Sequence, residues 1–194
     1  MTRGRLEAFS DGVVAILITI MVLELRPPPG FELAALRPLV PKLLSYLLSF
    51  VYLGIYWNNH HHLLHAVQRV DGRVLWANLH LLFWLSLTPF ATAWMGETGA
   101  APSTVALYAA VQLLAALAYT FLTRALLALH PADSPLALAL GADWKGRVSV
   151  VAYALAVPLA FANRWLGLGV LVAVAVVWWV PDPRIERALE RPRT

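Results

Sequence analysis

Charged and hydroxyl side chains interrupt an apolar segment close to the start of the chain. Arg5 and Asp11 lie in its first turns, and Thr19 lies in its middle. An ionisable side chain at the centre of a membrane-spanning helix costs roughly 2.5–3.5 kcal/mol on insertion scales, and it usually faces a helix bundle or a water path. These residues therefore predict a helix that does more than anchor the chain in lipid.

A second group of polar side chains is the run WNNHHHLLH, which begins at Trp57. His61 and His65 are four residues apart, and His62 and His65 are three apart, so either pair could chelate a metal ion on a helix face. Membrane di-iron enzymes need several such histidine boxes, whereas this chain has 6 histidines in all. A metalloenzyme is therefore the weaker interpretation, and we expect neither a resident metal nor catalysis.

Asp11 needs a hydrogen-bond donor from another helix or subunit. Glu7 lies four residues before it, a like-charge spacing that destabilises an isolated helix, and Arg5 points elsewhere on the helix. The histidine run is the nearest supply, because a carboxylate and an imidazole satisfy each other in a dry site. Two interpretations stay open: a structural tie between helices, and a gate or proton sensor that uses histidine titration near neutral pH.

One face of the first helix combines a glycine, two branched apolar residues and a threonine: Gly12, Ile16, Thr19 and Leu23. Their spacings of four, three and four residues place them on one side of a helix. Around a symmetry axis, Ile16 would form an apolar constriction of the kind that gates by dewetting. Thr19, about one turn away, would offer oxygen ligands to a cation. The competing interpretation is that Ile16 and Leu23 pack or face lipid.

The composition of the whole chain favours a membrane protein with several spans. Its 194 residues are 60% hydrophobic and 13% charged, whereas soluble domains are about 45–50% apolar and about 25% charged. The chain has no cysteine, which excludes disulfides and thiolate chemistry. The first segment is as long as a full span and no small-residue cleavage site follows it, so we expect no cleaved signal peptide.

Six segments are candidates for membrane spans, which need about 20 mostly apolar residues. We predict an all-α integral membrane fold of six transmembrane helices, forming a single domain over residues 1–194 with a basic cytoplasmic tail at 181–194. Pro158 is expected to kink or end the fifth helix, and the fifth and sixth helices should form a tight hairpin. The predicted spans are 6–25, 42–64, 74–95, 103–129, 148–162 and 165–180.

The distribution of basic residues predicts the orientation in the membrane. Eleven of the 15 Lys and Arg residues lie at the two chain ends and in or beside the second and fourth loops. Because positive residues stay cytoplasmic, both termini are predicted to be cytoplasmic. The polar ends of the first three spans then lie at one depth. The basic residues on the other side are Arg26, Arg37, Lys42 and Arg164.

The start of the first helix carries a recognisable signature. The string RLEAFSDG at 5–12 has a fixed Arg followed by Phe-Ser-Asp-Gly, and it continues as AILITIMVLEL and then, on the second span, as WNNHH. This pattern resembles the transmembrane protein 175 family, which includes lysosomal channels of animals and plasma-membrane homologues in prokaryotes. The match covers the first two helices. The residues that carry it are Arg5, Phe9, Ser10, Asp11, Gly12 and Trp57.

The resemblance implies specific roles for the first helix. Members of this family are potassium-permeable channels without the usual carbonyl filter, and the first helix lines the pore. Ile16, five residues after the motif Asp, would form the apolar constriction. Thr19 would be the threonine linked to selectivity, and Leu23 would form a second apolar ring.

The resemblance also implies a supporting polar network and an assembly. Arg5, Asp11 and a histidine of the second helix would form the network. That histidine is expected to be His61, although His60 and His62 are its neighbours. Prokaryotic members are homotetramers of six-span subunits, so we expect a fourfold channel with the first helix at its axis.

We therefore expect a multi-pass channel in the plasma membrane of a prokaryote that conducts K⁺ passively and favours it over Na⁺. Its partners would be copies of itself and the lipid bilayer, with no nucleic acid and no cofactor besides the permeant ion. Two alternatives remain: a proton channel on the same scaffold, and a proton-coupled secondary transporter that uses Asp11 and the histidines of the second helix.

Overall fold

The fold consists of helices. The computed structural model describes residues 2–134, 136–137 and 143–179, and within these ranges it has no β-strand. The all-α fold predicted from the sequence is confirmed. In chain order the elements are α1 (Arg3–Leu23), the 3₁₀ helix η1 (Leu33–Leu39), α2 (Val40–His65), α3 (Gly72–Ser86), α4 (Thr88–Glu97), α5 (Pro102–Leu127), α7 (Trp144–Ala162) and α8 (Arg164–Trp179).

Five helical segments in the described part of the chain are long and apolar enough to cross a membrane. They are α1, η1 with α2, α3 with α4, α5, and α7. The remaining helix, α8, has 16 residues. At 1.5 Å per residue it spans about 24 Å, compared with about 30 Å for the hydrocarbon core of a bilayer. Within the described residues, which end at 179, the six predicted spans thus correspond to five full-length segments and one apolar helix of 16 residues.

The third predicted span, 74–95, is divided between two helices. α3 ends at Ser86, α4 begins at Thr88, and Leu87 caps both of them. Pro89 lies in the first turn of α4. Because proline has no N–H to donate to the carbonyl four residues back, the hydrogen bonds of α3 cannot continue unbroken through this point. The span therefore consists of two helical pieces.

The last two described helices form the expected hairpin. α7 continues past Pro158 to Ala162, so this proline does not end the helix. Asn163 alone separates α7 from α8, and its side-chain oxygen accepts a hydrogen bond from the backbone N–H of Trp165 at 2.9 Å. This bond satisfies one of the free donors at the start of α8. The basic tail predicted at 181–194 lies outside the described residues.

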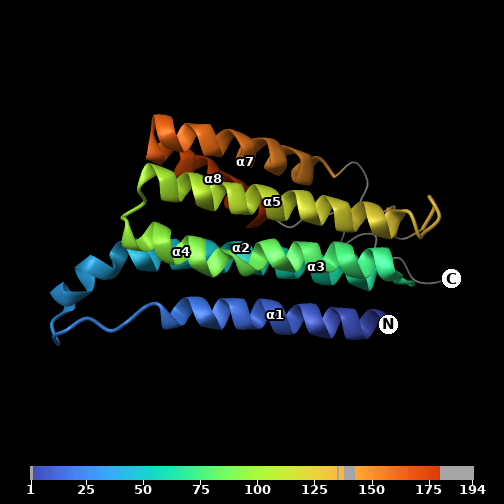
Figure 1. Cartoon of the computed structure of the whole chain (residues 1–194), viewed down its shortest axis with the longest axis horizontal. Helices are drawn as coiled ribbons and strands as arrows, with labels where there is room; N and C mark the ends of the chain where they lie inside the picture. The colour runs from blue at the N-terminus through green and yellow to red at the C-terminus, as the bar shows by residue number, and fades with distance from the viewer. Residues whose placement is uncertain (1, 135, 138–142, 180–194) are drawn as a thin grey trace.

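The helices form an elongated bundle with α1 along one edge and the α7–α8 hairpin along the other (Figure 1). α1 packs on α2, α3 and α4, whereas α7 and α8 pack on each other and on α5. α1 and α2 run in opposite directions (Figure 1). The start of α1 therefore lies beside the end of α2, which is the geometry that a shared polar layer requires.

Candidate functional site

α1 has one face buried against the bundle. The side chains on this face recur every three or four residues, which is the period of a helix stripe. Four of them are apolar and one is a serine. The buried residues are Leu6, Ser10, Val14, Leu17 and Met21.

The predicted pore residues lie on the opposite face of α1. At about 100° per residue, they lie roughly 150° around the helix from the buried stripe. Ile16 is 57% exposed and Leu23 is 75% exposed, and Gly12 and Thr19 are exposed with them. The hydroxyl of Thr19 donates a hydrogen bond to the carbonyl of Ile16 at 2.9 Å. The structure therefore places the four residues together on the free edge of the protomer.

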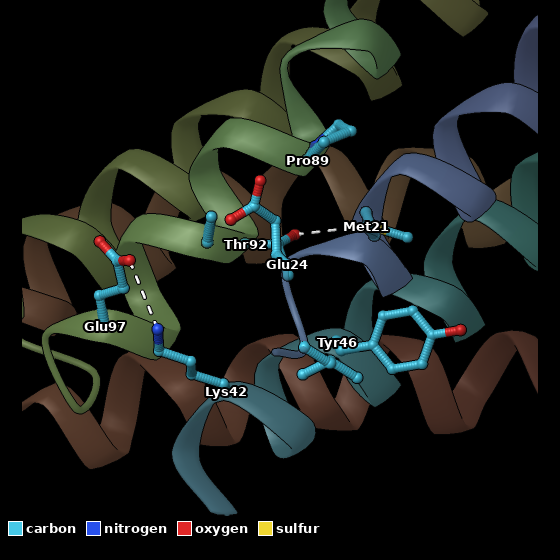
Figure 2. A pocket seen from close by; sticks show the side chains of 9 residues that line it. Met21, Glu24, Lys42, Tyr46, Pro89, Thr92 and Glu97 are labelled. Carbon is cyan, nitrogen blue, oxygen red and sulfur yellow. Dashed lines mark hydrogen bonds and ion pairs between the residues drawn. The ribbon is translucent and has the colours of Figure 1, made fainter. Parts of the chain in front are cut away.

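The C-terminal end of α1 lies beside a small pocket that also contains residues of α2 and α4. Figure 2 shows Glu24, Lys42 and Glu97 around this pocket. Lys42 Nζ lies 3.4 Å from Glu97 Oε1, which links α2 to α4. Deeper in the pocket, the hydroxyl of Thr92 contacts the sulfur of Met21 at 3.8 Å. Two acidic side chains, Glu24 after α1 and Glu97 at the end of α4, thus line this pocket together with one lysine.

A buried chain of hydrogen bonds joins three helices near the start of α1. His60 Nε2 lies 2.7 Å from Asn78 Oδ1; because an amide oxygen only accepts, the imidazole donates. The amide nitrogen of Asn78 donates to Ser10 Oγ at 2.9 Å, and Ser10 donates to the carbonyl of Leu6 at 2.9 Å. Asn78 is fully buried. These three hydrogen bonds therefore link side chains of α1, α2 and α3.

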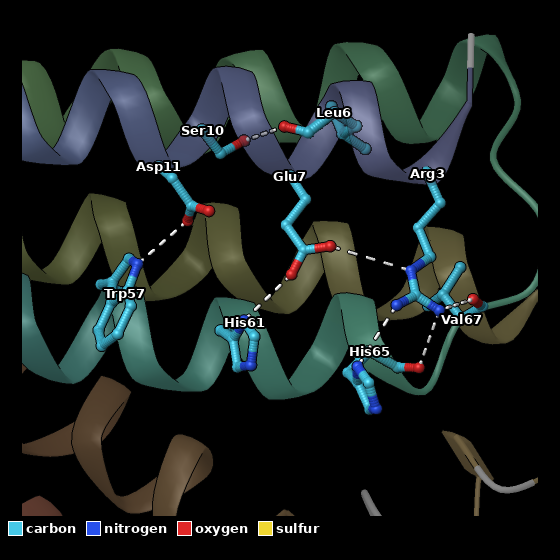
Figure 3. A network of polar contacts seen from close by, with 9 residues as sticks. All are labelled: Arg3, Leu6, Glu7, Ser10, Asp11, Trp57, His61, His65 and Val67. Atoms are coloured by element: carbon cyan, nitrogen blue, oxygen red, sulfur yellow. Dashed lines mark hydrogen bonds and ion pairs between the residues drawn. The ribbon is translucent and has the colours of Figure 1, made fainter.

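A second, more exposed set of polar contacts connects α1 to α2 (Figure 3). The indole N–H of Trp57 donates to Asp11 at 3.1 Å. His61 Nδ1 lies 3.0 Å from Glu7 Oε1. Arg3 completes the set, with its Nε 3.9 Å from Glu7 Oε2. These contacts follow the two antiparallel helices in register over a little more than two turns of α1.

Within the chain, the partner of Asp11 differs from the predicted one. The donor is Trp57 on α2, and His61 pairs with Glu7 instead. The physical reason is rotation: Asp11 and Glu7 are one turn apart on the same side of α1, and Trp57 and His61 are one turn apart on α2. The antiparallel helices therefore match each carboxylate with the side chain directly opposite it.

Within the chain, the arginine that joins this polar network is Arg3, whereas Arg5 was predicted to do so. Its guanidinium donates to the carbonyls of His65 and Val67 at 3.1 and 3.3 Å. These carbonyls lie at and just beyond the end of α2, where an arginine satisfies free acceptors and the helix dipole. Arg5 and Phe9 are exposed instead. Arg5 lies on the same side of α1 as Ile16, since 100° per residue brings the two positions within about 20°.

Sequence reasoning missed the central position of Asn78 and the roles of Glu7 and Arg3. Asn78 was detectable, because an amide within an otherwise apolar helix must find partners in a membrane. The pairing of Glu7 with His61 had no comparable signal, since it depends on the rotation of α1. Among the described residues, no three His, Asp or Glu side chains gather closely enough to hold a metal ion.

Comparisons with known proteins agree with this arrangement. The family described as endosomal/lysosomal potassium channel TMEM175 matches residues 5–89. A potassium channel of Chryseobacterium sp. strain P1-3 is 48% identical over 190 residues, which cover 98% of this chain and 99% of the relative. A potassium channel of Streptomyces collinus is 34% identical over 201 residues, covering 95% of this chain and 97% of the relative.

A solved structure is also similar. It is the crystal structure of a lysosomal potassium-selective channel TMEM175 homologue from Chamaesiphon minutus. The TM-score is 0.78 at 31% sequence identity, and the match covers 91% of this chain and 96% of that chain. The similarity therefore extends through the whole bundle, including the helices that carry no recognisable motif.

Proposed function

The chain belongs to the TMEM175 family, and from this premise we propose that it is a potassium-permeable channel. It is a multi-pass membrane protein, and the bacterial relatives that match nearly its whole length are named potassium channels. Conduction is passive and occurs in the bacterial inner membrane. These full-length relatives favour potassium over the alternatives of a proton channel or a proton-coupled transporter.

The observation that carries the pore assignment is the exposed face of α1. A threonine, a glycine and an arginine on one face are more typical of a face that meets water or another copy of the chain than of one that meets only lipid. Gly12, Thr19 and Arg5 share their side of α1 with Ile16 and Leu23, at the free edge of the protomer. The pore is formed where these faces of several copies meet.

Ile16 forms the narrow apolar constriction of this pore, and Leu23 forms a second apolar ring about two turns away. An apolar ring of this kind controls conduction by the ease with which water fills it. Thr19 lies between the two rings. Its hydroxyl proton is used in the bond to the carbonyl of Ile16, so the lone pairs of its oxygen remain available to a partly dehydrated cation.

Polar residues at the start of α1 support the pore and set its assembly. Ser10 and Asp11 hold α1 on α2 and α3 through Asn78 and Trp57. Within the described residues no hydrogen bond or ion pair holds Arg5, so its guanidinium is available to a neighbouring copy. We assign the assembly as a homotetramer around a fourfold axis, which native mass spectrometry of the purified protein tests directly. A mass other than that of four chains would exclude it.

Flux from proteoliposomes tests the function. The vesicles contain K⁺, and a membrane-permeant dye outside reports the charge movement that compensates K⁺ efflux. We expect K⁺ efflux that needs no added substrate and saturates little with K⁺ concentration. Na⁺ efflux should be slower. Ile16→Asn makes the constriction easier to wet, so it should raise the flux or reduce the preference for K⁺. Ile16→Val is the matched control, because it keeps the ring apolar.

Three results would contradict the proposal. The first is the absence of K⁺ flux from liposomes that contain folded protein. The second is a saturable uptake that requires a proton gradient, which would indicate the transporter alternative. The third is an Ile16→Asn variant whose flux and selectivity equal those of the wild type, which would exclude Ile16 as the constriction.

A further inference from the structure

A separate cavity lies between α2, α5, α7 and α8, away from the exposed face of α1. Its empty space is about 480 Å³, including the part open to the surroundings. No residue of α1 lines it. Its lining includes five aromatic side chains and one carboxylate at the start of α7. The residues that define this aromatic cavity are Tyr52, Tyr56, Tyr119, Asp143, Tyr153 and Trp178.

The polar ends of the aromatic side chains are already used in hydrogen bonds. Tyr52 donates to the carbonyl of Leu171 at 2.6 Å, and Tyr119 donates to the carbonyl of Asn59 at 3.1 Å. The indole N–H of Trp178 donates to Ser149 at 2.8 Å. With these donors occupied, the cavity offers a ligand chiefly ring surface, and ring faces attract cations.

The rings are held in fixed orientations relative to one another. Tyr52 and Tyr153 have centroids 6.0 Å apart with their planes tilted by 59°. Tyr56 and Tyr119 are 6.3 Å apart with an angle of 63°. The rings of each pair therefore pack in a tilted or edge-to-face arrangement, which fixes their orientation in the cavity wall.

Asp143 gives the cavity its charge. It caps α7, where its Oδ1 accepts from the backbone N–H of Gly146 at 3.1 Å. Burial raises the pKa of this carboxyl, although the bond from Gly146 and the charge of Arg147 act in the other direction. A cation that enters the cavity would stabilise the charged form of this desolvated carboxyl.

The lining selects the chemical class of this cation. A small hard ion such as Mg²⁺ or Ca²⁺ needs several oxygen ligands, usually including more than one carboxylate, to replace its water, and Asp143 is the one carboxylate among the lining residues. An anion would meet the carboxylate of Asp143. An organic ammonium group fits both features, because its carbon atoms pack on the rings and its charge pairs with Asp143.

We propose that the aromatic cavity binds an organic ammonium group, with Asp143 as its counter-ion and the tyrosine rings as its aromatic wall; the ring of Trp178 already has Lys145 Nζ 5.8 Å from its centroid. Two sources share this chemistry: a soluble amine, and the ammonium of a phosphatidylethanolamine headgroup. The binding is independent of the channel assignment, because the cavity contains none of the residues of the pore face.

Isothermal titration calorimetry with choline tests the proposal on the full chain in an amine-free detergent. The matched ligand is 3,3-dimethylbutan-1-ol, which has the same shape without the charge. We expect choline to bind about tenfold more tightly than the neutral alcohol, because only the cation gains the attraction to the rings and the carboxylate. Equal binding of the two, or no binding of choline, would overturn the proposal.

Matched variants locate the site. Asp143→Asn keeps an equally good helix cap but removes the charge, so choline affinity should fall about tenfold. Asp71→Asn is the control, since Asp71 caps α3 by accepting from Val74 at 2.9 Å and lies outside the cavity. Equal losses in both variants, or no loss in Asp143→Asn, would overturn the assignment to this cavity.

A second pair of variants tests the aromatic wall. Tyr119→Phe keeps the ring and loses only the bond to Asn59, so choline should still bind. Tyr119→Leu removes the ring and should weaken binding several-fold. Equal choline binding by the two variants would show that the ring of Tyr119 does not contribute to the binding site, which would overturn this part of the proposal.

The source of the ligand is distinguished in lipid nanodiscs. Weaker choline binding in discs of phosphatidylethanolamine than in discs of phosphatidylglycerol would show that the lipid headgroup competes for the cavity. The same choline affinity in both discs would assign the cavity to a soluble amine.

Discussion

The two edges of the bundle are built in different ways. The α7–α8 hairpin is held by small residues: a Cβ added at Gly167 would lie 2.9 Å from the Cα and Cβ of Ala160, and Ala156 and Ala160 are fully buried. α1 is held by one apolar stripe and by polar ties near its start. Close backbone packing therefore holds one edge, and hydrogen bonds between helices help to hold the other.

The exposed sides of these edges differ as well. From Val148 to Ala162 and from Trp165 to Trp179, the exposed residues of the hairpin are all apolar, glycine or proline, which suits contact with lipid. The exposed side of α1 includes Arg5 and Thr19. This difference is what we expect if the hairpin faces lipid and if, as proposed, the exposed side of α1 meets water, ions or another copy of the chain.

The largest expected effect is at Asn78, where the polar tie of α1 is fully buried. Asn78→Leu would leave His60 and Ser10 without their partner, at about 1–3 kcal/mol for each unpaired group. We expect a lower midpoint of thermal unfolding in detergent, with loss of the assembled protein. Ser86→Ala on the same helix is the control, because Ser86 bonds only to Phe83 of its own helix. Equal stability of the two variants would mean that packing alone holds α1.

The next effect is at Gly167, where the hairpin is tightest. Gly167→Val would force a side chain into the backbone of α7, and such overpacking costs about 1–3 kcal/mol. Gly169→Val is the control, since a Cβ at Gly169 meets no atom within 4 Å. We expect a lower yield and unfolding midpoint for Gly167→Val only. Equal yields and unfolding midpoints for the two variants would mean that close backbone packing does not hold the α7–α8 hairpin.

A smaller effect is expected at Trp57. Trp57→Phe keeps the ring but removes the donor to Asp11, a partly exposed bond that contributes about 1 kcal/mol. α1 should then be held less firmly, which hydrogen–deuterium exchange detects as faster exchange near the start of α1. Trp76→Phe, on an exposed part of α3, should not change this exchange. Unchanged exchange in Trp57→Phe would mean that this bond does not hold α1.

The smallest effect is expected at Glu7. Glu7 forms an ion pair with Arg3 at 3.9 Å, in which the side chain of Arg3 is 35% exposed, and ion pairs of this kind contribute about 0.2–1 kcal/mol. Glu7→Gln should lower the unfolding midpoint slightly at low salt, and the difference from wild type should vanish near 1 M salt, where charges are screened within about 3 Å. A difference that persists at high salt would indicate a role beyond the ion pair.

The sequence was sufficient for features that depend on composition and spacing. A run of about 20 apolar residues locates α1 within a few residues, and the four-three-four spacing correctly groups Gly12, Ile16, Thr19 and Leu23 on one side. The antiparallel order of the first two helices was enough to expect a shared polar layer. That these residues line a pore stays a proposal, because it depends on contacts between copies of the chain.

Features that depend on helix rotation were not predictable. Trp57 and His61 are both on α2, and only the angle at which α2 faces α1 decides which of them reaches Asp11. Pro89 could have predicted the break between α3 and α4, because proline interrupts the backbone hydrogen bonds of a helix. Hydropathy alone could not predict it, because the apolar run continues through the break. The aromatic cavity could not be predicted from the sequence, because its walls come from four helices that are spread along the chain.

The central claim is that the exposed face of α1 lines a pore, and cysteine accessibility tests it most directly. The chain has no cysteine of its own, so a single introduced thiol reports one position. Ile16→Cys and Val151→Cys are a matched pair, since the two side chains are 57% and 59% exposed on α1 and α7. A charged thiol reagent reacts with the thiolate, which forms in water and not in lipid. We predict that the reagent abolishes K⁺ flux through Ile16→Cys and leaves Val151→Cys unaffected. Unchanged flux through a labelled Ile16→Cys protein, or equal inhibition of both variants, would contradict the claim.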